Sequence, residues 1–219
     1  METKKVDWQL VILVCSIIII MIMGVRQSLG LFLDPITSFM KSGKEFFSFA
    51  IGVQAIIWGI VTFFLGILID KLGPQKVLAF GIISYSSGIF LMSNPTSEFV
   101  LFSATTLMGF GLGGAGMATM VSIAGKVAPV NQRSLAMGLV AAAASFGQFA
   151  VVLPTMWMNK EFGWEVSLVV LASISISLLL LLPLLNSTNE KNSNVQDFGN
   201  SLQQTIMFSL KERNYILLI

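Results

Sequence analysis

One charged side chain, Arg26, lies well inside an apolar stretch of this sequence, and the amide Gln27 follows it. A cation among apolar residues is costly and marks a functional candidate, because a guanidinium can bind an anion through paired hydrogen bonds. The pair therefore predicts an anion-binding position. In the competing interpretation, Arg26 lies about 27 Å along a helix counted from Trp8, so it extends toward the outer membrane surface or pairs with Asp34.

Two further sets of polar residues recur at helical spacing. Gln54, Trp58 and Thr62 stand four residues apart, and Ser145 and Gln148 stand three apart, so each set shares one helix face. An amide in an apolar helix needs hydrogen-bond partners. Both stripes are candidates for the polar wall of a substrate cavity, and ordinary hydrogen bonding between helices is the alternative for each.

The residue types that covalent or metal chemistry needs are scarce. The chain has no His and a single Cys, Cys15, which excludes a Ser-His-Asp triad, His-held zinc or haem and a disulfide framework. The net charge of +2 is too small to suggest nucleic acid. We therefore expect non-covalent binding of a ligand, with no cofactor, no metal and no enzymatic activity.

The elements that must position these residues are membrane helices. Of the 219 residues, 55% are hydrophobic and 11% are charged, whereas a soluble domain carries about 25% charged residues. The lipid bilayer is therefore the expected surroundings. Six apolar runs separated by short turns predict antiparallel spans at residues 8–33, 46–69, 77–92, 99–125, 134–158 and 166–185.

The distribution of Lys and Arg predicts the orientation of these spans. Three basic residues fall on one side, at Lys41, Lys44 and Lys160. Nine fall on the side of both termini, at Lys4, Lys5, Lys71, Lys76, Lys126, Arg133, Lys191, Lys211 and Arg213. Both ends are therefore expected in the cytoplasm, with the protein in a plasma membrane of the bacterial inner-membrane kind.

The turn between the second and third spans resembles the cytoplasmic loop motif of the major facilitator superfamily, Gly-x-x-x-Asp-Arg/Lys-x-Gly. The match falls on Gly66, Asp70, Lys71 and Gly73. Pro74 and Gln75 then stand where basic residues are usual, which leaves Lys76 as the basic residue that follows. An ordinary charged turn is the alternative, but the place of the loop between spans two and three favours the family.

Asp70 is the unusual residue of this loop. An acid at the end of a helix opposes the helix dipole, so Asp70 needs a partner such as Arg133 or the N-terminus of another helix. The resemblance implies a gating role for these residues, namely Gly66, Asp70, Lys71, Gly73, Lys76 and Arg133.

Other segments look like the monocarboxylate porter and oxalate/formate antiporter branch of the superfamily. They are residues 24–36, 45–50, 133–138, 145–148 with Pro154, and 162–164, with Glu165 as a departure where a basic residue is common. The resemblance implies a secondary transporter that moves a small organic anion, a mono- or dicarboxylate, by alternating access. A proton is the candidate co-substrate.

Members of the superfamily carry twelve spans in two halves, so the chain is expected to be the first half of such a fold. We expect a six-span bundle at residues 1–186, a cytoplasmic linker at 187–213 and the start of a seventh span at 214–219. The linker should hold an amphipathic helix, or else be partly disordered. The missing second half is then the partner. The alternatives are a fragment without activity of its own and a six-span protein that forms homodimers.

The glycines of spans two and four are expected to serve helix packing. Gly111, Gly113 and Gly116 match a dinucleotide-binding fingerprint, but that motif needs a preceding strand, whereas here it lies in an apolar run. Small residues let membrane helices approach closely. Span two carries a similar heptad-spaced seam of Gly52, Gly59 and Gly66. The resemblance to the superfamily implies that this face meets the missing half.

Overall fold

The computed structural model describes residues 8–191, except for the side chains of Asp70 and of residues 186–191. These residues are almost entirely helical, and the compact unit that contains the helices ends at Thr188. Six segments are long and apolar enough to cross a membrane. The all-helical, six-span prediction is therefore confirmed for the described part of the chain. The predicted linker helix and seventh span fall outside the described residues.

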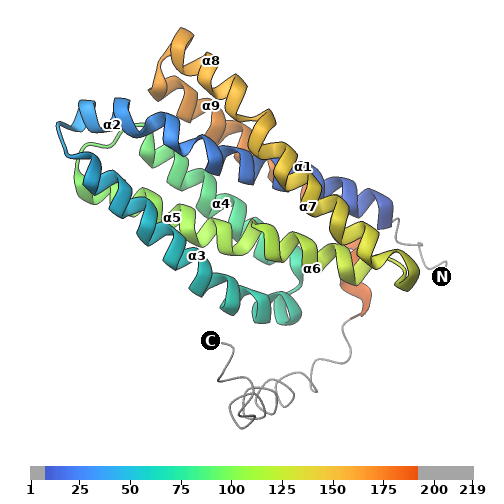
Figure 1. The fold of residues 1–219 in the computed structure, drawn as a ribbon. Helices are drawn as coiled ribbons and strands as arrows, with labels where there is room; N and C mark the ends of the chain where they lie inside the picture. Colours follow the sequence, from blue (N-terminus) through green and yellow to red (C-terminus); the bar gives the residue numbers. More distant parts are fainter. Residues whose placement is uncertain (1–7, 192–219) are drawn as a thin grey trace, which may run out of the picture. The chain divides into compact units, whose positions relative to one another are not determined.

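Several spans consist of more than one helical piece (Figure 1). The pieces are, in order, α1 (Trp8–Ser28), η1 (Leu29–Phe32) and α2 (Leu33–Met40) in span one, α3 (Lys44–Leu72) in span two, α4 (Pro74–Met92) in span three, α5 (Glu98–Ala115) and α6 (Met117–Val127) in span four, η2 (Val130–Gln132), α7 (Arg133–Ala150) and α8 (Val152–Phe162) in span five, and α9 (Trp164–Ser177) and η3 (Leu178–Lys191) in span six.

Two of these interruptions occur close to prolines. Pro154 lacks the N–H that would bond to the carbonyl of Ala150, and α7 ends at Ala150. Pro183 lies inside η3, where the sixth span tightens into a 3-10 helix from Leu178 onward. The prolines therefore have the helix-distorting role that the sequence suggests.

Span four, which the sequence predicts as one span over residues 99–125, is interrupted at Gly116. Gly116 adopts an extended conformation between α5 and α6. A Cβ there would clash with the carbonyl of Leu112 and lie 3.2 Å from Nε1 of Trp58, so only glycine fits. The hydroxyl of Thr119 donates to the carbonyl of Gly113 at 3.3 Å and bridges the interruption.

Glycines allow α5 to pack closely between α3 and α4. A Cβ at Gly111 would lie 2.5 Å from Cβ of Tyr85 on α4, and one at Gly113 would lie 2.9 Å from Cβ of Val61 on α3. On the other side of the bundle, α1 packs against α7, where Gly147 lies against the backbone of Ile20. Of the fingerprint-like glycines of span four, Gly111 and Gly113 thus serve helix packing, whereas Gly116 ends α5.

The turns before spans three and six have the same backbone conformation. Gly73 has φ 84° and ψ 155°, and Gly163 has φ 86° and ψ 162°, and each is the N-cap of the next helix. A positive φ with extended ψ is accessible to glycine and strained for other residues. The repetition three spans apart is consistent with the repeated three-helix units known within halves of this architecture.

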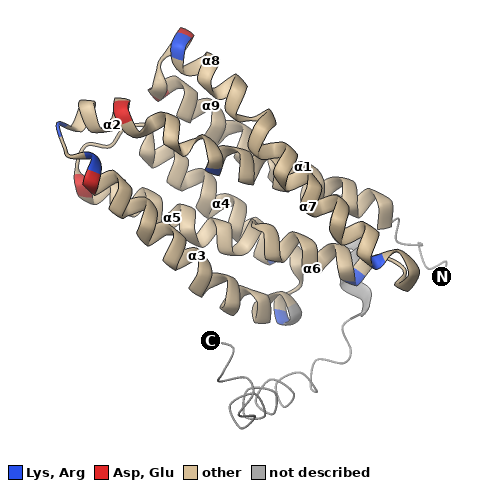
Figure 2. Ribbon diagram, viewed as in Figure 1, with Lys and Arg blue, Asp and Glu red and all other residues tan. Residues whose placement is uncertain are grey.

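Charged residues gather at the two ends of the helices, and the middle of the bundle is almost free of them (Figure 2). Of the six spans, the second is the least buried and the fifth is the next least. On α3, no other described residue would come within 4 Å of a Cβ at Gly52, Gly59 or Gly66. The seam on span two is therefore uncovered in the described chain.

Candidate functional site

Arg26 of α1 lies against Trp58 of α3. The Cζ atom of Arg26 is 4.8 Å from the centroid of the Trp58 ring, which is the geometry of a cation–π contact. Both side chains are half-buried, and Trp58 is the central residue of the 29-residue helix α3. The contact therefore places Arg26 near the middle of the bundle, deeper than its position along the apolar run suggests.

The other proposed partner of Arg26, Asp34, is engaged elsewhere. Its carboxylate forms an ion pair with Nζ of Lys44 at 2.6 Å, and both side chains are well exposed. This pair joins α2 to the start of α3 at one end of the bundle. The suggestion that Asp34 pairs with Arg26 is therefore wrong, because Asp34 meets a lysine much closer to it.

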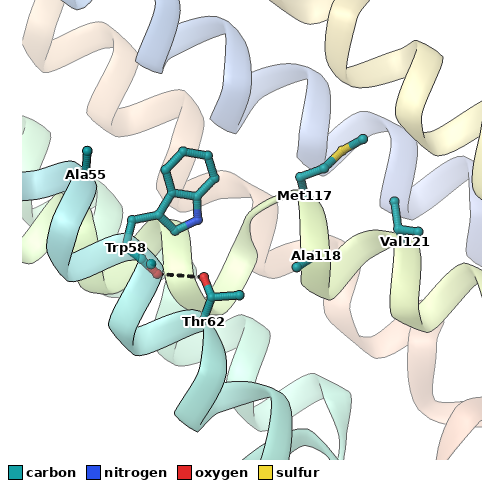
Figure 3. A pocket seen from close by; sticks show the side chains of 7 residues that line it. Ala55, Trp58, Thr62, Met117, Ala118 and Val121 are labelled. Carbon is teal, nitrogen blue, oxygen red and sulfur yellow. Dashed lines mark hydrogen bonds between the residues drawn. The ribbon is translucent and has the colours of Figure 1, made fainter. Parts of the chain in front are cut away.

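Trp58 also forms one wall of an open cavity of about 630 Å³ between α3 and α6 (Figure 3). Its size is typical of sites for small molecules. The lining is mostly apolar and consists of Ala55, Trp58, Gly59, Thr62, Met117, Ala118 and Val121. The hydroxyl of Thr62 donates to the carbonyl of Trp58 at 2.7 Å, so this hydrogen bond lies within α3.

The interruption of span four brings the first residues of α6 to this cavity. Met117 and Ala118 follow Gly116 directly and face Trp58 across the space in Figure 3. The first N–H groups of a helix have no partner within the helix. The sequence does not predict this wall, because a glycine that ends a helix cannot be told by sequence from a glycine that packs against another helix.

The remaining predicted binding residues take different positions. Gln54 is 2% exposed, one turn from Trp58, and its Nε2 has no hydrogen-bond partner among the described residues. Gln27 is exposed. Ser145 and Gln148 are exposed on α7, and neither lines the cavity beside Trp58. The structure thus brings together Arg26 and Trp58, and Gln54 lies one helical turn before Trp58 on α3.

The predicted gating residues lie where the second span meets the third and where the fifth begins. Lys71 and Lys76 are exposed on either side of the Gly73 turn, and Arg133 is the exposed first residue of α7. The Gln75 amide, which stands where a basic residue is usual, donates to the carbonyl of Leu182 at 3.0 Å. The side chain of Asp70 is outside the described part, so its partner stays a prediction.

The comparison with protein families identifies the class of protein. The profile of the Major Facilitator Superfamily matches residues 10–219, which is nearly the whole chain. The chain therefore belongs to the Major Facilitator Superfamily of membrane transporters. This membership makes it a transporter component rather than an enzyme.

Several curated transporters are similar to parts of this chain. The vesicular acetylcholine transporter of Drosophila melanogaster is 32% identical over 66% of the chain, and the agnestins efflux protein AgnL12 of Paecilomyces divaricatus is 28% identical over 57%. The uncharacterized MFS-type transporter YcxA of Bacillus subtilis (strain 168) is 26% identical over 71%. The matched segments cover 26%, 27% and 38% of those proteins, so the matched part of this chain spans well under half of each.

Proposed function

We propose that this chain is the N-terminal half of a secondary transporter that carries a small organic anion by alternating access. The observation that carries the proposal is the cation–π contact of the Arg26 guanidinium with Trp58, whose side chain lines an open cavity. A guanidinium has five N–H donors, so Arg26 can bind a carboxylate while Trp58 holds it in place.

The charge next to the cavity favours an anion over a cation. The relative from Drosophila is named for acetylcholine, a cation, and aromatic faces do bind quaternary ammonium groups. Here Arg26 covers one face of Trp58, and its positive charge would repel a second cation. Since Arg26 is a single cation beside a mostly apolar lining, a monocarboxylate is favoured over a dicarboxylate.

The proposal includes a second half and an orientation. We infer that the uncovered sides of α3 and α7 pack against six further spans, which the short coverage of the longer relatives supports. Both ends of the chain then lie in the cytoplasm of a cell whose plasma membrane holds the protein, as the Lys and Arg bias favours. The complete transporter means this chain together with that second half.

Uptake measurements test the proposal. Proteoliposomes that hold the complete transporter are given radiolabelled lactate, benzoate or oxalate, with and without an inward proton gradient. Arg26→Gln should lower uptake roughly 10- to 100-fold, because a hydrogen-bonded charge is lost, and Arg26→Lys should fall between. Lys160→Gln removes an exposed cation at the end of α8 and should match the parent.

Two results would contradict different parts of the proposal. If the parent takes up none of the three anions under either gradient, the substrate class is wrong. If Arg26→Gln transports as well as the parent, Arg26 does not bind the substrate, and the cavity beside Trp58 loses its assigned role.

A further inference from the structure

Tyr85 is the largest fully buried side chain in the described part of the chain, and it lies in the middle of α4. Its hydroxyl donates to the main-chain carbonyl of Ile22 on α1 at 3.0 Å. A buried phenol in an apolar bundle is costly without an acceptor, so this bond fixes the direction of the side chain. Tyr85 therefore ties the third span to one particular turn of the first.

That turn is the one that carries Arg26. In an α-helix the carbonyl of Ile22 accepts the N–H of the residue four positions later, which is Arg26. A carbonyl oxygen has two lone pairs, so the Tyr85 hydroxyl and the Arg26 N–H can share it. The hydroxyl thus contacts the same peptide group that anchors the backbone of Arg26.

The same turn is fixed from two other directions. Gly24 lies so close to Gly147 and Val151 of span five that a Cβ would clash with both. On the side of α3, the Arg26 guanidinium contacts the ring of Trp58. The bond from Tyr85 adds a polar, directional contact from span three to the same turn.

Span four makes room for this arrangement. A Cβ at Gly111 would lie 2.5 Å from Cβ of Tyr85, so only a glycine lets α5 approach α4 where Tyr85 departs from the helix. Gly111 thus leaves room for the side chain of Tyr85, and the hydroxyl of Tyr85 fixes the turn of α1 that carries Arg26.

We propose that Tyr85 is a positioning residue for Arg26: its hydroxyl holds the Ile22–Arg26 turn so that the guanidinium faces the ring of Trp58 and presents its edge to a carboxylate. The role in transport rests on the proposed function, whereas the effect on the stack of Arg26 and Trp58 does not.

The residue next to Tyr85 provides a matched control. The hydroxyl of Ser84 donates to the carbonyl of Leu107 on α5 at 2.8 Å. It is a bond of the same kind, from the same turn of α4, to a different span. Ser84→Ala therefore removes a tie between spans without touching α1, and Tyr85→Phe removes the hydroxyl while keeping the ring beside Gly111.

Magnetic resonance of the arginine side chains gives a direct test that needs no substrate. The complete transporter is labelled with ¹⁵N-arginine in lipid nanodiscs, and the Nε–H signal of Arg26 is assigned by its loss in Arg26→Lys. The ring current of Trp58 should displace this signal, and Trp58→Leu shows its unstacked position. In Tyr85→Phe the signal should move at least halfway to that position, and in Ser84→Ala it should stay.

Transport gives the second readout. With the best transported of lactate, benzoate and oxalate, Tyr85→Phe should raise the half-saturating concentration roughly three- to tenfold and leave the maximal rate within about twofold. Ser84→Ala should leave the half-saturating concentration unchanged.

The possible results separate the two proposals. An Arg26 signal that stays in Tyr85→Phe overturns the positioning role, and so does an equal displacement in Ser84→Ala, since the effect would then be general loosening of span three. If the signal moves only in Tyr85→Phe but Arg26→Gln transports normally, the positioning role holds and the proposed substrate site fails.

Discussion

Arg26 contacts Trp58 and is the residue on which the proposed anion site depends. Its Cζ atom lies 4.8 Å from the centroid of the Trp58 ring, a contact that contributes about 0.5–2 kcal/mol depending on how far it is desolvated. The N–H groups of a guanidinium are the donors that recognise carboxylates. The sequence identifies Arg26 because a charge inside an apolar run is conspicuous. It identifies Trp58 only as one of a stripe, because nothing local indicates which faces of two separate spans meet.

Glycines of similar spacing differ sharply in what surrounds them, which leads to a prediction at the scale of single residues. A Cβ at Gly114 would lie 2.8 Å from Cα of Gly81 and 3.0 Å from the carbonyl of Val77. Gly114→Ala should therefore lower the free energy of unfolding by about 1–3 kcal/mol through overpacking.

Gly52 is the control for that substitution when both variants are made in this chain without a second half, because no described residue would come within 4 Å of its Cβ. Gly52→Ala should leave stability unchanged or raise it by up to about 1 kcal/mol through helix propensity. Reversible denaturation in mixed micelles measures both variants. Equal losses of unfolding free energy at the two positions would show that α4 and α5 are packed less tightly than the structure indicates.

At the scale of helices, interruptions are predictable only when their cause is local. Pro154 and Pro183 mark the distortions of spans five and six, because a missing N–H and a ring clash act within one turn. The break at Gly116 depends on Trp58 and Leu112, of which Trp58 belongs to another span. The sequence thus predicts six spans, but not the half-helix α6 that lines the cavity.

The link between spans three and six gives a prediction about helix docking. The amide of Gln75, at the start of α4, donates to the carbonyl of Leu182, next to Pro183 in the 3-10 part of span six. Gln75→Ala should lower the free energy of unfolding by about 0.5–1.5 kcal/mol, since that partly buried carbonyl loses its donor. Ser87→Ala, which removes an exposed hydroxyl from the same helix, should have no measurable effect on the same denaturation curves. A Gln75→Ala curve that superimposes on that of the parent would mean that the bond contributes nothing to docking.

At the scale of the whole molecule, the exposed faces are as informative as the core. Span two has an apolar surface with bulky residues such as Phe63 and Phe64 exposed beside an open glycine seam. Lipid can cover the aromatic residues, but a row of glycines favours close contact with another helix. Composition and periodicity predict the bundle and its spans, whereas they do not identify a cargo. The proposed alternating access of two halves needs a switch where the halves meet, and the loop after α3 is the candidate.

Asp70 is the residue of that loop on which the prediction depends. It occupies the last turn of α3, where the helix dipole disfavours a negative charge unless a partner compensates it. If a partner for Asp70 is available in only one of the two states, the charge of Asp70 favours that state. Asp70 then shifts the equilibrium between the states without contacting the substrate. Asp70→Asn in the complete transporter should therefore lower the maximal rate of carboxylate uptake about tenfold and leave the half-saturating concentration within about twofold.

Glu165→Gln is the matched neutralisation for this measurement, because Glu165 is an exposed acid in the first turn of α9, at the end of the bundle predicted to be external. Its uptake kinetics should match those of the parent. Binding is followed separately by exchange of labelled carboxylate at equal concentrations on both sides of the membrane. If Asp70→Asn transports at the parental rate, or if its loss of rate comes entirely from weaker binding, Asp70 does not act as the switch.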